Sequence, residues 1–192
     1  MFVAFLLSAL AQQRHRPLSV EELAAASPVS GVAVVERIDT RIDPETRAVY
    51  TDAALVFHEI WAGEAAPGFL LTQVGGTQGG RTSAMPGWNY RLVPGERIAV
   101  FAVPWKGPYH VVKGMRQGLF HIDAGHGAVR DLDDRRLTLD ALRGTVQGVL
   151  GKTPVRAAPP EEQGRPPGLR SSSRPESFRW WLPVVGILGL WI

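Results

Sequence analysis

The feature that most constrains this chain is an alternation of apolar and polar residues, with a period of two, in two neighbouring segments. In Gly31–Asp43 one face comprises Val32, Val34, Ile38, Thr40 and Ile42, and the other comprises Arg37, Asp39, Arg41 and Asp43. In Val49–Trp61 the alternation places Val49, Thr51, Ala53, Leu55, Phe57 and Trp61 opposite Tyr50, Asp52 and His58. Successive side chains of a strand point to opposite faces, so both segments predict long half-buried strands, joined by a turn at 43–46.

Glycine and proline divide the rest of the chain into shorter elements. Shorter strands are predicted over Phe69–Val74, Arg97–Val103, Tyr109–Lys113 and Gly118–Ile122. Ser19 and Glu22 form a capping-box pattern that predicts a short helix over Glu21–Ala26. A helical stripe of Leu139, Leu142, Val146 and Leu150, stopped by Gly151, predicts a closing helix.

Five or six strands with helices only at the ends predict an all-β fold. The preferred architecture is a small antiparallel OB-like β-barrel over residues 29–151, preceded by a short N-terminal helical region over residues 12–28. A β-sandwich is the second choice. Residues 152–179 are rich in Pro, Arg and Ser and poor in large apolar side chains, so they are expected to form an extended, disordered stalk.

Both ends of the chain carry apolar segments. Residues 1–11 form an apolar run that closes with Ala9 and Ala11, as in a signal peptide cleaved before Gln12. Residues 180–192 lack charge and predict a hydrophobic C-terminal helix that associates with a membrane through Trp180, Trp181, Leu188 and Trp191. A tail folded back onto the barrel is the alternative. We therefore expect an extracytoplasmic protein, in the periplasm or at the cell surface.

Composition excludes several function classes. The chain has no cysteine, so disulfides, catalytic thiols and Cys-ligated zinc are excluded. Its formal net charge is +3, and residues 152–179 account for all of it, with six basic and three acidic side chains. A neutral body does not match the electrostatic footprint of a nucleic-acid-binding domain, so no nucleic-acid partner is expected.

Several short motifs resemble a known group of domains. They are Val56–Gly63, Gly75–Gly80, Pro86–Trp88, Pro94–Phe101 and Tyr109–Gly114 followed by Gln117–Phe120. Together they resemble uncharacterised bacterial secreted OB-like domains, similar to the region that precedes matrixin-type metalloproteases. The layout also resembles netrin and metalloprotease-inhibitor modules more loosely. The resemblance covers roughly residues 29–150, carries no catalytic residues, and departs from the pattern at Ala62, where a lysine is usual.

No motif predicts catalysis or a cofactor. The glycine-rich segment 75–80 fits neither phosphate-loop pattern and is interpreted as a flexible connection between strands. His58, His110 and His121 fall on predicted strands, without metal-ligand spacing, so no metal site is predicted. The segment Asp131–Asp134 is interpreted as a solvated turn, and no serine lies in a nucleophile setting.

Loop aromatics are the best candidates for binding. Aromatic side chains give large contact area at little cost in conformational entropy, although they can equally plug the ends of a barrel. The candidate ligand-binding residues are Trp88, Tyr90, Trp105, Arg81 and Arg91. We expect a non-catalytic binding or structural module with a protein partner in the cell envelope. The alternatives are a metalloprotease-associated inhibitor or pro-domain-like regulator and, more weakly, an unrecognised hydrolase.

Overall fold

The computed structural model describes residues 16–64, 68–85, 90–123, 127–131 and 136–157, and these residues are mostly β-sheet. Among them are two helices, α2 (Val20–Ala26) and α3 (Leu139–Leu150). The strands are β1 (Val29–Ile42), β2 (Val49–Ala62), β3 (Phe69–Gln78), β4 (Arg81–Ala84), β5 (Arg97–Pro104), β6 (Tyr109–Val112), β7 (Leu119–Ile122), β8 (Ala128–Asp131), β9 (Arg136–Thr138) and β10 (Val155–Arg156). The signal-peptide, hydrophobic C-terminal and most of the stalk predictions lie outside the described residues.

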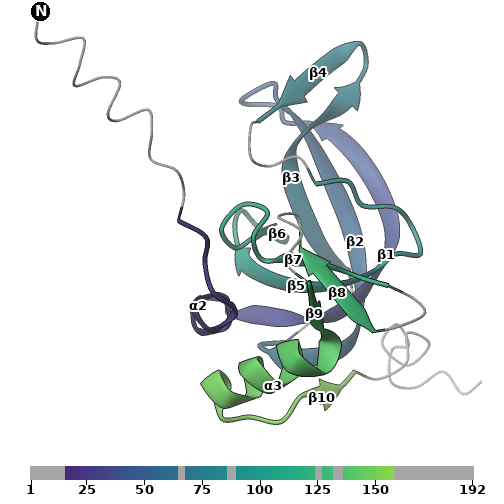
Figure 1. Ribbon diagram of the computed structural model, residues 1–192. Helices are drawn as coiled ribbons and strands as arrows, with labels where there is room; N and C mark the ends of the chain where they lie inside the picture. Colours follow the sequence, from purple (N-terminus) through teal and green to yellow (C-terminus); the bar gives the residue numbers. More distant parts are fainter. Residues whose placement is uncertain (1–15, 65–67, 86–89, 124–126, 132–135, 158–192) are drawn as a thin grey trace, which may run out of the picture.

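Five of the strands pair in a ring. The order is β1-β2-β3-β6-β5, and β5 pairs again with β1, so the last strand of the series returns to the first. All pairings in the ring are antiparallel except that between β3 and β6, which is parallel. The sheet continues beyond the ring from β5 through β7, β8 and β9, while β4 and β10 attach to β3 and β2. The result is a ten-stranded sheet rather than a simple barrel (Figure 1).

Strands β6 and β7 lie along the same edge of β5. Strand β6 pairs with residues 102–104 of β5, and β7 pairs with residues 98–100. Both run antiparallel to β5. Between them, Phe101 accepts a backbone hydrogen bond from Lys113 and donates one to Gly118. The chain between β6 and β7 therefore forms a short loop whose two ends are both hydrogen-bonded to Phe101. The packing there is close, since a Cβ on Gly118 would lie 2.9 Å from the carbonyl oxygens of Lys113 and Phe101.

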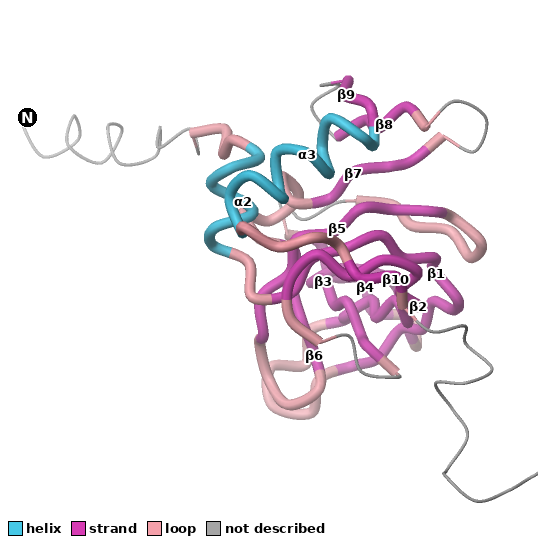
Figure 2. Tube along the Cα trace, turned by 90° about the horizontal axis from the view of Figure 1, so that it is seen from below, coloured by secondary structure: helices cyan, strands magenta, loops and turns pink. Residues whose placement is uncertain are grey.

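The two faces of the sheet bury two separate cores. The first core takes residues from all five strands of the ring and includes Val35, Leu55, Leu71, Val100 and Val112. The second core lies between the strands and the helices, which pack side by side on one side of the sheet (Figure 2). Its members include Leu23 of α2, Phe101 and Phe120 of the sheet, and Leu142 and Val146 of α3.

Irregularities in β1 and β2 change which side chains point inward. Val35 pairs with Leu55 and Arg37 pairs with Ala54, so Glu36 is an extra residue that reverses the alternation. Val32 consequently packs in the second core, whereas Ile38 packs against the first. The prediction that Val32, Val34 and Ile38 share one face is therefore wrong. Trp61 likewise belongs to the second core, not to the core that holds Phe57.

The local signals for the helices are confirmed. Ser19 caps α2 with both hydrogen bonds of a capping box, and Gly151 ends α3 in the left-handed conformation. Leu142 and Val146 are the buried residues of α3, and Leu139 and Leu150 pack against the same core.

Three short strands differ from the sequence predictions. The glycine-rich segment 75–80 is not a loose connection, because β3 extends through Gln78 and pairs with β4 as a hairpin. Asp131 ends β8 and is buried, so residue 131 does not belong to a solvated turn. Val155 and Arg156 pair with β2 as β10, so the first residues of the predicted stalk belong to the sheet. Each of these short strands is defined by a partner rather than by a periodic pattern.

Candidate functional site

A groove lined with aromatic and apolar side chains lies over the outer face of β2, β3 and β6. The lining residues of this aromatic groove, which has a volume of about 260 Å³, are Tyr50, Thr72, Val74, Met85, Trp105 and Val111. Tyr50 of β2 pairs with Val74 of β3. Ala53 and Leu71 on the same two strands point into the first core. Because side chains alternate along a strand, Tyr50 and Val74 point to the opposite face. The groove therefore uses the face that the alternation leaves outside the ring.

Trp105 forms one wall of the aromatic groove. Its ring lies 5.3 Å from that of the buried Tyr50, and 37% of its surface is exposed. The backbone N–H of Trp105 donates to the carbonyl of Tyr109 at 2.9 Å, and the N–H of Tyr109 donates to the carbonyl of Lys106 at 3.0 Å. This tight turn between β5 and β6 fixes the position of a large, partly solvated indole ring.

A buried polar network supports the groove from the side of β1. The Arg41 guanidinium lies between the rings of Tyr50 and Tyr109, with its carbon 4.7 and 4.1 Å from their centroids. Its Nε donates to Asp52 Oδ2 at 2.7 Å, and Asp52 Oδ1 accepts from the Thr72 hydroxyl. Its Nη2 is buried and has no hydrogen-bond partner within the described part of the chain. Arg41 thus holds an unused donor beside the groove.

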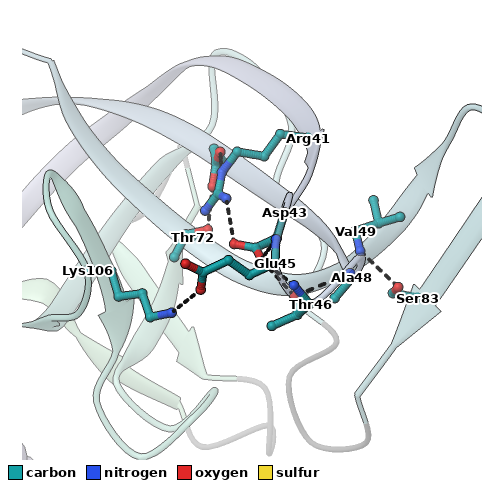
Figure 3. Close-up of polar contacts among 10 residues, drawn as sticks. Arg41, Asp43, Glu45, Thr46, Ala48, Val49, Thr72, Ser83 and Lys106 are labelled. Carbon is teal, nitrogen blue, oxygen red and sulfur yellow. Dashed lines mark hydrogen bonds and ion pairs between the residues drawn. The ribbon is translucent and has the colours of Figure 1, made fainter.

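Two loops meet at this end of the sheet. In the turn between β1 and β2, Asp43 lies 3.9 Å from Arg41, and Glu45 lies 4.0 Å from Lys106 of the turn between β5 and β6 (Figure 3). The β4 hairpin is tied to the same region, because Ser83 Oγ accepts from the backbone N–H of Val49 at 2.9 Å. These contacts bring Met85, directly after β4, to the groove.

Asp43 organises the turn between β1 and β2. Its Oδ1 accepts from the backbone N–H of Thr46 at 2.8 Å, from the Thr46 hydroxyl at 3.0 Å and from the N–H of Glu45 at 3.1 Å. The backbone hydrogen bond from Thr46, followed by its hydroxyl, lowers the pKa of Asp43 below its ordinary value because these donors favour the charged carboxylate.

This pKa shift predicts a loss of stability in acid. A depressed native pKa contributes stability that is present above the unfolded-state pKa and is lost as the pH falls through the native pKa. Between about pH 5 and about pH 3 we expect urea unfolding to show a steeper loss of stability for the wild type than for Asp43→Asn, which keeps an acceptor oxygen without the charge. Parallel pH profiles for the two proteins would contradict this role of Asp43.

The residues proposed from sequence are separated in the structure. Trp105 lies at the aromatic groove, Arg81 is exposed elsewhere, and Trp88 is outside the described residues. Arg91 is exposed and lines the same cavity as Tyr90. Tyr90 is 4% exposed and packs in the first core beside a cavity of about 180 Å³, and burial raises the pKa of its phenol. Tyr90 is therefore a buried core residue, as expected if the loop aromatics fill the end of the barrel. Sequence reasoning missed Tyr50, Arg41, Thr72 and Met85, whose positions were part of a polar strand face or lay outside any pattern.

Two histidines of the described residues, His110 and His121, contact neighbouring side chains of the sheet. His110 stacks on Phe69 with ring centroids 4.1 Å apart, and burial lowers its pKa. His121 Nδ1 contacts Glu96 Oε1. Across the described residues there is no group of three or more His, Asp or Glu side chains placed to hold a metal ion. The same part of the chain has no helix long and apolar enough to cross a bilayer.

No protein-family model, curated protein or solved structure matches this chain. A functional assignment therefore begins from the shape and chemistry of the aromatic groove.

Proposed function

We propose that this chain is an extracytoplasmic, non-catalytic binding module whose aromatic groove takes an apolar side chain from a protein partner. One observation carries the proposal: a partly exposed tryptophan lines a largely apolar hollow of about 260 Å³. Large aromatic anchors beside a pocket are characteristic of the residues that dominate protein–protein binding.

The ring of strands supports an OB-like barrel as the framework of this module. Its order β1-β2-β3-β6-β5, with a parallel pairing of β3 and β6 and a return pairing of β5 to β1, supports a five-stranded, partly open Greek-key barrel. OB folds bind ligands on the face of their second and third strands, between the loops that follow their first and fourth strands. In support of this comparison, the aromatic groove is lined by residues of β2 and β3 and by Trp105 of the loop that follows β5.

A protein segment suits the groove better than a nucleic acid. The lining is largely apolar and contains no charged side chain, so the groove itself offers no basic track for a phosphate backbone. Location outside the cytoplasm is supported by the apolar run that closes with Ala9 and Ala11.

Trp105→Ala tests the proposal directly. Random peptides displayed on phage would be selected on the full chain, and enriched peptides would be synthesised and titrated by calorimetry. We expect the enriched peptides to share a large apolar residue and Trp105→Ala to weaken their binding by about 2 kcal/mol, roughly thirtyfold, because the indole is the exposed anchor. Urea unfolding of the same variant separates lost binding from lost folding.

Val93→Ala provides the matched control. Val93 is 47% exposed and lies outside the aromatic groove, so its truncation removes exposed apolar surface without touching the site. Peptides that bind the wild type and Trp105→Ala equally would overturn the proposal. Selective capture of metalloprotease catalytic domains, lost in Trp105→Ala, would identify the protein partner as a protease and the module as its regulator.

A further inference from the structure

A second hollow shares no lining residue with the aromatic groove. It has a volume of about 620 Å³ and is lined by residues of α3, the segment 153–156, β1, β2 and the start of β5. Figure 1 shows α3 and β10 next to each other. We call it the basic cleft, because its charged lining consists of Arg97, Arg143, Arg156 and the single carboxylate Glu59, with His58 at its side. This volume is in the range of small-molecule sites.

The one carboxylate of the basic cleft is already fully engaged. Glu59 Oε1 accepts from Arg143 Nε at 2.7 Å and from the Trp61 indole N–H at 2.8 Å, and Oε2 accepts from Arg143 Nη2 at 2.9 Å. Burial alone would raise the pKa of Glu59, but the hydrogen bonds from Arg143 and Trp61 outweigh it and hold the pKa below its ordinary value. Glu59 and Arg143 are therefore fixed to each other, and Arg143 also pairs with the exposed Asp140 at the edge of this site.

Two guanidinium groups have no ion-pair partner in the described part of the chain, although the charge of Arg97 contributes to the lowered pKa of Glu59. Among the described residues, neither Arg97 nor Arg156 makes an ion pair or a hydrogen bond through its side chain. They lie on different elements, at the start of β5 and on β10, and both line the same hollow. The cleft thus carries an excess of positive charge, whereas the body of the chain is neutral overall.

The backbone of β2 is irregular at this site. Val32 pairs with Glu59 and Ala33 pairs with Phe57, so His58 is an extra residue in β2. Because of this bulge, the adjacent residues His58 and Glu59 both line the cleft, which a regular strand would not allow. Ala157 then donates its N–H to the His58 carbonyl at 3.0 Å and fixes β10 against the bulge. The arginine of β10 is held at the cleft by this pairing.

We propose that the basic cleft binds a small ligand through an oxyanionic group, a carboxylate or a phosphate, held by Arg97 and Arg156. Guanidinium groups match both oxyanions with paired N–H donors, and Gln147 and Thr153 add neutral hydrogen-bonding groups to the lining. Val34 and Pro154 provide apolar walls for the body of the ligand. This site is separate from the aromatic groove and does not depend on the function proposed for that groove.

The test is an NMR titration of the full, ¹⁵N-labelled chain at constant ionic strength. Inorganic phosphate and succinate are added in separate series, with sodium chloride as the balancing salt. The Trp61 indole N–H, which contacts Glu59, and the backbone amides of residues 58, 59 and 156 report on the cleft. We expect saturable shifts at these groups, and the anion that binds more tightly identifies the oxyanion.

Arg97→Gln and Arg156→Gln should each weaken binding about tenfold, because each removes one charged donor. Arg91→Gln is the matched control, since Arg91 is exposed and lies outside the cleft but carries the same charge. Trp105→Ala should leave the titration unchanged, which separates this site from the aromatic groove. Shifts that do not saturate with either anion, or an equal loss in Arg91→Gln, would overturn the proposal.

Discussion

Replacing Gly31 with alanine is expected to destabilise the domain by about 3 kcal/mol, near the upper end of the usual cost of overpacking. An alanine Cβ at this position would lie 2.2 Å from the backbone carbonyl oxygen of Glu59 and 3.0 Å from the Phe57 ring. Backbone cannot rotate away as a side chain does, and Gly31 is also paired with Val100 on the opposite edge of β1. Strands β1 and β2 would have to separate at their most irregular point.

Urea unfolding of Gly31→Ala and Gly144→Ala provides a paired test. Gly144 lies inside α3 with open space around its Cα, so alanine there should stabilise the protein by about 0.5–1 kcal/mol through helix propensity. The same substitution is thus expected to act with opposite signs at two glycines. Equal stability of Gly31→Ala and the wild type would show that β1 and β2 do not approach as closely as described.

Signals contained in a few consecutive residues were sufficient to predict several elements. The reciprocal bonds of Ser19 and Glu22, and the left-handed Gly151, depend only on their immediate neighbours, so the sequence predicts both helices closely. The two long strands were also correctly placed, because their alternation extends over many residues. Such predictions succeed where local energetics and tertiary packing favour the same structure.

Bulges were not predictable in the same way. Glu36 and His58 are extra residues relative to the opposite strand, and nothing in their own identities distinguishes them from neighbours in a regular strand. Their effect is to reverse the inward face of each strand, which moved Val32 and Trp61 into the second core. The basic cleft depends on the His58 bulge, so the alternation of apolar and polar residues in the sequence does not indicate it.

The aromatic groove was predicted in part. Trp105 was identified as an aromatic residue in or beside a loop, where exposed aromatic side chains often serve binding. Tyr50 and Asp52 were assigned to a solvated face, yet both are buried because Trp105 stacks on Tyr50 and Arg41 covers Asp52. Contacts between residues so distant in the chain leave no periodic trace. A binding face built from such contacts is recognised only after folding.

Phe101→Ala is expected to cost about 3–5 kcal/mol, a large share of the stability of a domain of this size. Phe101 is fully buried, and its ring contacts those of Trp61 and Phe120 with centroids 5.8 and 5.9 Å apart, beneath both helices. Because β7 and the helices close over this ring, the cavity left by its removal has little means of collapsing. Val149→Ala, on the exposed side of α3, should change the free energy of unfolding by less than about 0.5 kcal/mol. A loss below about 1 kcal/mol for Phe101→Ala would mean that the second core contributes little, and that α2 and α3 are not held to the sheet by this aromatic cluster.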